Sequence, residues 1–280
     1  MATLSSADPI FPLDIERDIF KYALAQQGLI PFPYNLVLVA KRVHHWLSHK
    51  LYDTIVVHET QDYPNKWDRT KLEKYGQFVR NLFVWQAGSQ SELSLQCLSS
   101  CPNVVNLVFW VPTPSQEMVD VISRLPLTHL SIDLDGIEKP TPGLINMFSK
   151  VTHLDCLNRL DLGLGHVIHF TSLTHLAVPF ISITSQTHQS LLFNQFPKLN
   201  ALISWDAERD GNTAESVKVI DDFDDPDEDE PRVVNLLCPV DSDVQNWLDE
   251  IRSGRGIWGL AIEAIVMRIL LADAIRRLGL

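Results

Sequence analysis

An apolar pattern of fixed spacing recurs along most of the chain. Each copy has a central leucine, an apolar residue three positions before it and, in every copy but the one that holds Ser204, an apolar residue two positions after it. The central leucines, called anchors below, are Leu82, Leu107, Leu130, Leu154, Leu176, Leu202 and Leu236. Their spacing lies in the twenties except for the last, longer step. A period of that length is typical of a solenoid, because each unit is too small to bury its own apolar face and must stack on its neighbours.

Helical patterns fill the segments between the anchors. Apolar residues recur there at three- and four-residue steps, within 93–98, 118–122, 144–148 and 191–196. Prolines follow three of these segments, as they do after many helices. The pattern therefore predicts that each unit consists of a strand, a loop, a helix and a second loop. We expect an α/β fold with a parallel sheet and helices on its outside, preceded over residues 58–75 by a loop and a short helix.

The first 57 residues have a different pattern, which predicts two helices and a strand. Ile15, Ile19 and Tyr22 share one helical face. After a loop that contains glycine and prolines, a second helix is expected over about 34–51, and a short strand over 51–57.

The sequence of this stretch resembles an F-box, in the form found in fungal F-box-like proteins. The matching residues are Phe11-Pro12-Leu13-Asp14-Ile15, Ile19-Phe20, Val39-Ala40-Lys41, Trp46, Leu51-Tyr52 and Ile55. The resemblance implies helix-in-groove docking on the small Skp-family adaptor of a cullin–RING ubiquitin ligase. The implied adaptor-binding residues are Pro12, Leu13, Ile15, Ile19, Phe20, Val39 and Trp46. The alternative is that these helices only cap the open end of the solenoid.

The repeated units resemble leucine-rich repeats of a degenerate kind. They lack the asparagine or cysteine that this family has five residues past the anchor. Alternate residues of a strand face opposite ways, so the residues beside the anchors form a second sheet face. On that face we predict target-binding residues: Phe83, Trp85, Trp110, Asp133, Asp155 and Trp205. The alternative is that a loop or the connector 63–75 covers these aromatic residues as ordinary core.

Three histidines, His129, His153 and His175, precede successive anchors. Stacked imidazoles at this spacing can share a metal or sense pH. The other interpretation is that the histidines recur only because the sequence Thr-His-Leu belongs to the repeated unit. No carboxylate or cysteine has the spacing to complete a metal site, so we expect no metal and no cofactor.

The net charge and the cysteine content limit the kinds of partner and the cellular compartment that we expect. The net charge of the 280 residues is −12, which argues against nucleic acid as the main partner. The acidic run 221–230 predicts a solvated insertion, or else a docking segment for a basic partner. Four cysteines without a CxxC motif, and no visible signal peptide or N-glycosylation site, favour the cytosol or the nucleus.

The C-terminal part reads as two helices. Residues 242–253 have the pattern of the last repeat's helix. Residues 254–280 are strongly apolar but carry charges around the helix, so we expect a cap on the last repeat and no membrane span.

The sequence thus predicts F-box-like helices over 1–57, a leucine-rich-repeat-like solenoid over 58–253 with an acidic insertion at 221–230, and a capping helix over 254–280. No catalytic motif is visible, so we expect no enzyme. The leading hypothesis is a substrate-recognition subunit of a cullin–RING ubiquitin ligase, which holds an unknown protein target on the solenoid. The alternatives are a stand-alone repeat scaffold without a ligase link and an unrecognised enzyme.

Overall fold

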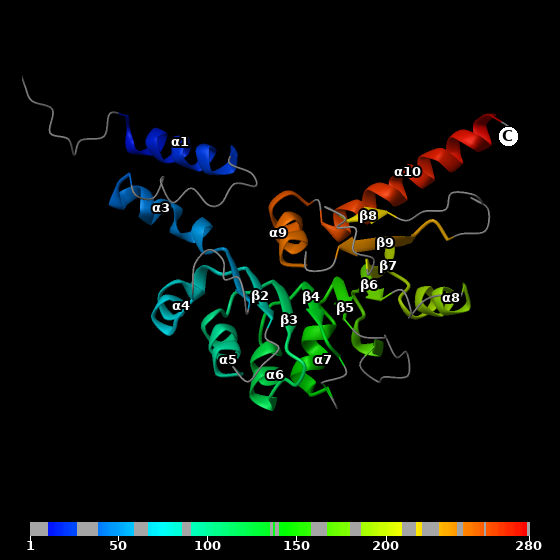
Figure 1. Ribbon diagram of the computed structural model, residues 1–280, viewed down its shortest axis with the longest axis horizontal. Coiled ribbons are helices and arrows are strands. Elements are labelled where there is room, and N and C mark those ends of the chain that lie inside the picture. Colours follow the sequence, from blue (N-terminus) through cyan, green and yellow to red (C-terminus); the bar gives the residue numbers. More distant parts are fainter. Residues whose placement is uncertain are drawn as a thin grey trace, which may run out of the picture.

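The fold is mixed α/β and contains an open, mostly parallel sheet of nine strands (Figure 1). The computed structural model describes residues 11–26, 39–58, 67–85, 91–134, 137, 140–157, 167–179, 186–208, 217–219, 230–239, 243–254 and 256–278. In sheet order the strands are β1 Thr54–His58, β2 Asn81–Trp85, β3 Asn106–Trp110, β4 His129–Ile132, β5 His153–Cys156, β6 His175–Pro179, β7 Ala201–Glu208, β9 Val233–Pro239 and β8 Lys218–Val219. Only β8 runs antiparallel to its neighbour.

Short helices connect the strands and cover one side of the sheet, as predicted. They are α4 Arg69–Tyr75, η1 Gly76–Phe78, α5 Ser91–Ser100, α6 Gln116–Ile122, α7 Pro142–Phe148, η2 Val167–His169 and α8 Gln186–Gln195. Three of them begin at a side chain that accepts a hydrogen bond from a free backbone N–H of the first turn, namely Asp68, Ser115 and Thr141. Such caps stabilise a helix start by about 1 kcal/mol.

The predicted row of anchors is confirmed for six of its seven leucines. Leu82, Leu107, Leu130, Leu154, Leu176 and Leu202 pair in register from β2 to β7, and all are buried. Ile55 of β1 extends the row by one strand. These residues define the first face of the sheet, which packs against α5, α6 and α7 (Figure 1).

The prediction that Leu236 is the seventh member of this row is wrong. Val233 pairs with Leu202, whereas Leu236 pairs with Trp205. The shift of three residues is an odd number, so it moves Leu236 to the opposite face. Val233 accordingly joins the core of the first face, while Leu236 joins a separate core cluster on the second face.

The N-terminal helices form a pair at one end of the molecule. They are α1 Leu13–Gln26 and α3 Lys41–Leu51. The expected second helix starts later than predicted, because Val39 and Ala40 are not helical; residues 34–38 lie outside the described part of the chain. The pair shares a small core of Val43, Leu47 and Leu51.

The C-terminal helices lie on the other side of the sheet from α4–α7 (Figure 1). They are α9 Asp243–Ser253 and α10 Ile257–Leu278. The prediction of α9 as an outer repeat helix is wrong, because its Leu248 packs on Val56, Phe83 and Val108 of the second face. Gly254, with φ 65°, provides the left-handed turn after α9 that an L side chain would resist.

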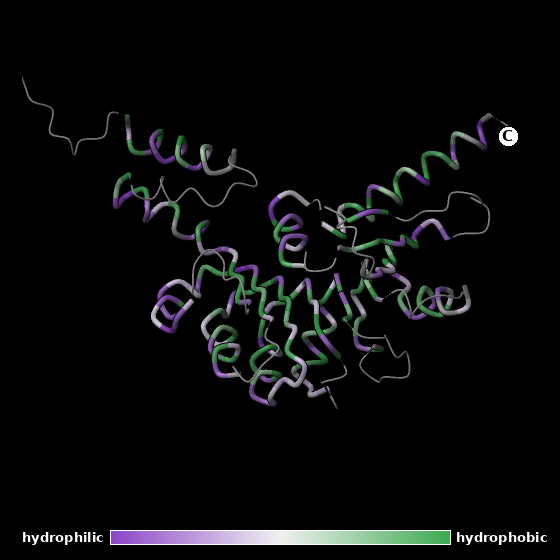
Figure 2. The backbone as a smooth tube through the Cα atoms, in the orientation of Figure 1, coloured by the Kyte–Doolittle hydropathy of each residue, from purple (hydrophilic) through white to green (hydrophobic). Residues whose placement is uncertain are grey.

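The first half of α10 is more than a terminal cap. Its Ala261 and Ile265 pack on the second face of β6, β7 and β9. Hydrophobic residues line the strands and continue along most of α10 (Figure 2). Its outer part exposes apolar side chains, namely Ile262, Val266, Met267, Ile269, Leu270 and Leu271. No helix in the described ranges is long and apolar enough to cross a membrane. The acidic insertion, apart from Glu230, lies outside the described residues.

Candidate functional site

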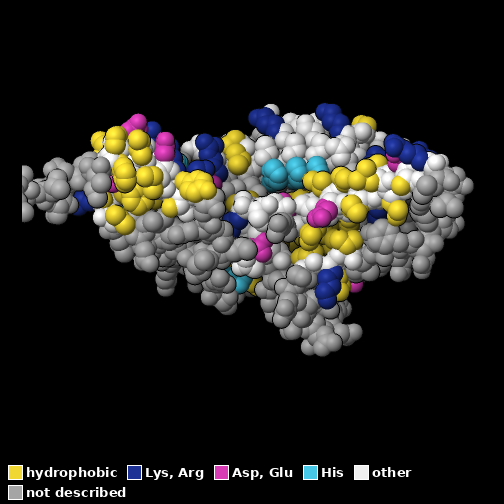
Figure 3. Space-filling model, turned by 90° about the horizontal axis from the view of Figure 1, so that it is seen from above, with side chains coloured by type: hydrophobic (Ala, Val, Ile, Leu, Met, Phe, Trp, Pro, Cys, Tyr) yellow, Lys and Arg dark blue, Asp and Glu magenta, His cyan; other side chains and the backbone are white. Residues whose placement is uncertain are grey.

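An exposed apolar surface on α1 is the first candidate site, and we call it the α1 surface. Its members are Phe11, Leu13, Ile15, Ile19, Tyr22 and Val39, each between 46% and 67% exposed. Figure 3 shows hydrophobic side chains gathered at this end of the molecule. Apolar patches of this kind on a folded chain mark contact sites for other molecules.

The neighbouring face of α1 fastens the helix to α3. Arg42 donates two hydrogen bonds to the Glu16 carboxylate, with N–O distances of 2.7 and 3.1 Å. Hydrogen bonding to Glu16 raises the pKa of the Arg42 guanidinium, so this group stays charged at neutral pH. Phe20 of α1 packs on the α3 core beside this pair. One side of α1 is therefore held in place, and the apolar side remains open.

The predicted adaptor-binding residues divide into two groups. Pro12, Leu13, Ile15, Ile19 and Val39 are exposed.

Phe20 and Trp46 are partly buried against the α3 core and keep some accessible surface. Helix α3 contacts η1 at the end of the sheet. Tyr52, just after α3, stacks on Tyr75 with ring centroids 3.8 Å apart. Figure 1 shows α1 on the far side of α3 from the sheet.

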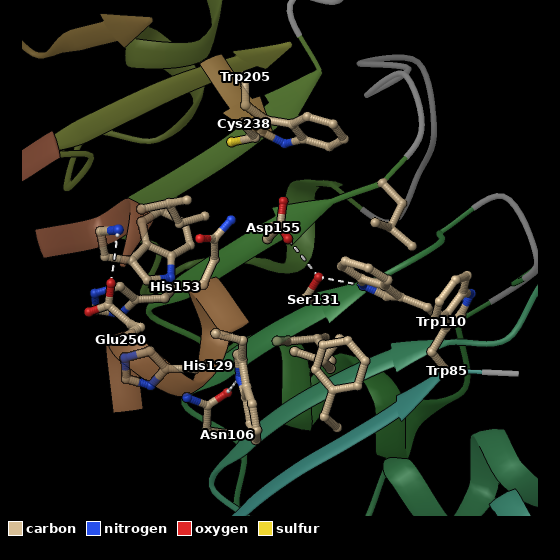
Figure 4. A pocket seen from close by; sticks show the side chains of 18 residues that line it. Trp85, Asn106, Trp110, His129, Ser131, His153, Asp155, Trp205, Cys238 and Glu250 are labelled. Carbon is tan, nitrogen blue, oxygen red and sulfur yellow. Dashed lines mark hydrogen bonds between the residues drawn. The ribbon is translucent and has the colours of Figure 1, made fainter. Parts of the chain in front are cut away.

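The second candidate site is a cavity of about 340 Å³ between the second face of the sheet and the C-terminal helices (Figure 4). Five tryptophans contribute to its walls, so we call it the tryptophan cavity. They are Trp85, Trp110, Trp205, Trp247 and Trp258. The first three come from the C-terminal ends of β2 and β3 and from β7, and the other two from α9 and α10.

Five of the six predicted target-binding residues line this cavity: Phe83, Trp85, Trp110, Asp155 and Trp205. Phe83 is fully buried, with ring centroids 5.3 Å from Trp110 and 5.4 Å from Trp247.

Phe83 is covered by α9 and has no exposed surface in this arrangement. Asp133 is partly buried and is not among the lining residues. Trp67, in the described part of the predicted connector, is buried in the core of the first face, and α9 packs over Phe83.

A hydrogen-bonded chain crosses the floor of the cavity. The Nε1–H of Trp110 donates to Ser131 Oγ at 2.8 Å, and Ser131 Oγ donates to Asp155 Oδ2 at 2.7 Å. The serine hydroxyl therefore donates to a carboxylate and not to an imidazole, so the arrangement of a catalytic triad is not formed. This chain fixes the orientation of the Asp155 carboxylate.

The sequence did not reveal the contribution of α9 and α10. Trp247 donates from Nε1 to Asn106 Oδ1 at 3.3 Å. Glu250 Oε2 accepts from the backbone N–H groups of Trp258 at 3.1 Å and Gly259 at 3.3 Å, at the start of α10. Burial raises the pKa of Glu250, and its backbone hydrogen bonds act in the opposite direction. The only available signal was the apolar face of 244–251, which predicts packing but not where.

The three histidines form a stack at the edge of the cavity. The ring centroids of His129 and His153 are 4.0 Å apart, and those of His153 and His175 are 4.1 Å apart. Burial lowers the pKa of all three, and lowers that of His153 to about 3 with help from its two neighbours. The imidazoles are therefore neutral at pH 7. Among the described residues, no group of three histidine, cysteine, aspartate or glutamate side chains is arranged to hold a metal ion.

Threonine hydroxyls set the tautomer of the stack. Thr152 Oγ1 donates to the carbonyl of Thr128 at 3.1 Å and lies 3.0 Å from His153 Nδ1. A hydroxyl has one proton, so Nδ1 carries the hydrogen and Nε2 is left as an acceptor. Thr174 and His175 repeat this geometry on the next strand.

No protein-family model matches this chain, and no curated protein matches it in sequence. The resemblances to an F-box and to leucine-rich repeats stay predictions.

Proposed function

We propose that this chain is a non-enzymatic substrate-recognition subunit that docks on a Skp-family adaptor through the α1 surface. In this proposal α1 and α3 are F-box-like, and the strand–helix units behind them form a leucine-rich-repeat-like solenoid. The observation that carries the proposal is the outward apolar face of α1. Ile15, Ile19 and Tyr22 recur at steps of four and three residues, and all three are about half exposed or more.

The energy available on this surface is adequate for specific binding. Full burial of an isoleucine or leucine side chain contributes about 1.5–3 kcal/mol. Because Ile15 and Ile19 are 48% and 46% exposed, each would gain about half of that, or roughly 1 kcal/mol, on docking. Ile15, Ile19 and Tyr22 share one face of α1 and would together supply a few kcal/mol from apolar burial alone. An unpartnered surface of this kind favours adaptor docking over simple capping.

The paired anchors and repeated helices support the solenoid part of the proposal. Six leucines align across six strands, and the segments that join these strands pack on the same core. Such a stack is stiff, so it would hold a protein target at a fixed distance from the adaptor. The target would not contact Phe83, since α9 covers that residue.

Adaptor capture tests the proposal. The full chain is mixed with purified Skp-family adaptor, and binding is measured by pull-down and by titration calorimetry. Changing Ile15 and Ile19 to aspartate removes about 2 kcal/mol of apolar burial, so affinity should fall at least roughly thirtyfold. The double variant should keep its far-ultraviolet circular dichroism, because neither side chain belongs to the α3 core.

A matched control lies at the other end of the molecule. Val266 and Leu270 of α10 are also four residues apart and are 48% and 60% exposed. Their change to aspartate should leave adaptor binding intact. If the folded wild-type chain does not bind the adaptor, or if both double variants bind as well as the wild type, the proposal is wrong. In the first case the stand-alone scaffold takes its place, and the exposed half of α10 is the surface to test first.

A further inference from the structure

We infer that the tryptophan cavity is a binding site for a small organic cation, such as a quaternary or methylated ammonium group. This inference does not rest on the proposed function, because the cavity and the α1 surface lie on different elements. It is argued from the size of the cavity, its aromatic walls and the sign of its charge.

The cavity has the size of a small-ligand site. Its volume of about 340 Å³ falls within the range of roughly 300–1,000 Å³ that such sites occupy. Trp85 and Trp110 at one end are partly exposed, so the cavity is open to a ligand there.

The walls favour a positive charge. The face of an indole ring is the best aromatic partner for a cation, and several rings around one space form a cage for ammonium groups. Five tryptophans contribute here, and the carboxylate of Asp155 lies on the floor with a fixed orientation. Among the described residues that line the cavity there is no lysine or arginine, whereas Asp155 and Glu250 are present. The site therefore disfavours an anion.

The positions of the walls are set before any ligand binds. Trp110 and Trp247 are each held by a hydrogen bond from Nε1. Trp258 meets His153 edge-on, with centroids 5.3 Å apart and planes at 82°. Rigid walls reduce the entropy that is lost on binding, which is the condition for a specific small-molecule site.

One donor in the cavity indicates a second property of the ligand. The Nε1–H of Trp205 is buried and has no acceptor among the described residues. Figure 4 shows this nitrogen on the side of its ring that faces Asp155. A buried donor without a partner costs about 1–3 kcal/mol. A ligand with a neutral oxygen near its cationic group, such as an amino alcohol, satisfies both Trp205 and the carboxylate.

The direct test uses choline and its uncharged carbon isostere, 3,3-dimethylbutan-1-ol, on the full chain. Both carry the same hydroxyl and the same shape, and only choline is charged. Binding is followed by titration calorimetry and by the change in tryptophan fluorescence. We expect choline to bind at least about tenfold more tightly than the isostere, as cation–π contacts in a desolvated site allow. Equal affinity for the two, or no binding of choline, overturns the inference.

Two carboxylate variants test the position of the ligand. Asp155→Asn removes the charge from the cavity floor and should weaken choline about tenfold while leaving the isostere unchanged. Asp133→Asn is the matched control, since Asp133 follows the neighbouring strand but does not line the cavity. If Asp133→Asn weakens choline as much as Asp155→Asn does, binding is not at this site. Thermal unfolding of each variant shows whether it is folded.

A trimethyllysine amide and a peptide that contains trimethyllysine distinguish the source of the cation. If both bind equally, the ligand is a free small molecule; if the peptide binds more tightly, the cation belongs to a protein side chain. In both cases the unmethylated lysine forms should bind more weakly, because the methyl groups provide the contact with the indole faces. Equal binding of methylated and unmethylated forms contradicts the cage.

Discussion

Mild acid is expected to destabilise this fold through the histidine stack. His129, His153 and His175 lie on adjacent strands with their rings in contact, and the edge of Trp258 covers two of them. Protonation would place like charges about 4 Å apart in a half-buried site. Burial lowers the pKa of all three, that of His153 from 6.5 to about 3. Between those two pH values the unfolded chain binds a proton at His153 that the folded chain does not.

The sign and size of the effect follow from this difference. A group whose pKa is lowered by folding stabilises the fold above its unfolded pKa, and the stability is lost as the pH falls toward the folded pKa. One such proton changes the free energy of unfolding by about 1.4 kcal/mol per pH unit. From about pH 6.5 to about pH 5 the upper limit for His153 is therefore about 2 kcal/mol, and solvent access to the ring reduces it to roughly 1 kcal/mol. His129 and His175 add to the effect with the same sign.

Urea unfolding between about pH 7.5 and about pH 5 measures this loss, above the range where ordinary carboxylates titrate. The change His153→Phe keeps a ring of similar size in the stack but removes the proton site, so the decline should become shallower. His49→Phe on the exposed surface of α3 is the control and should leave the slope as in the wild type. A wild-type free energy of unfolding that is constant over this interval, or an unchanged slope in His153→Phe, would refute the reasoning.

Three further outcomes are expected. Leu154→Ala leaves a void in the fully buried anchor row and should lower the free energy of unfolding by about 2–5 kcal/mol in urea titrations. In Gly259→Ala the new Cβ would lie 1.6 Å from the carbonyl oxygen of Gly254, so the turn between α9 and α10 must shift; we expect a loss of about 1–3 kcal/mol and an altered near-ultraviolet tryptophan signal. At pH 8 a thiol reagent should label Cys238 in the native chain far faster than the three buried cysteines, as read by mass spectrometry. Burial raises the pKa of Cys101 to about 12 and keeps its thiol protonated.

The parallel sheet could be predicted because each strand repeats one physical requirement. A residue at the anchor position must be apolar to reach the core of the first face, and parallel pairing in register then aligns the anchors. The rule failed at Leu236 because β9 has apolar residues at both Val233 and Leu236. The spacing from Leu202 does not decide between them, since the chain before β9 is longer than in the other units. In the structure Leu202 pairs with Val233, so Val233 and not Leu236 occupies the anchor position of β9.

The position of the C-terminal helices could not be predicted from their own pattern. An amphipathic face such as that of 244–251 predicts that a helix packs, but it does not say on which surface. The same holds for the α1 surface. The spacing of Ile15, Ile19 and Tyr22 predicts an apolar face but does not say whether another helix covers it, and only the structure shows that α3 does not.

The strands themselves nevertheless contain a signal for where the second face is covered and where it is hollow. Strands that are buried on both faces have unbroken apolar runs, and β2, β3 and β6 read in this way at Leu82–Val84, Leu107–Phe109 and Leu176–Val178.

On the second face the runs break in β4 and β5, where Ser131 and Asp155 stand. In the structure α9 packs on β1–β3 and α10 packs on β6, β7 and β9. The two polar residues therefore lie in the interval between the helices, and they form the floor of the tryptophan cavity. A packed core would select apolar residues at these two positions, as it does on either side. Their presence beneath five tryptophans is what the proposed site for an organic cation requires.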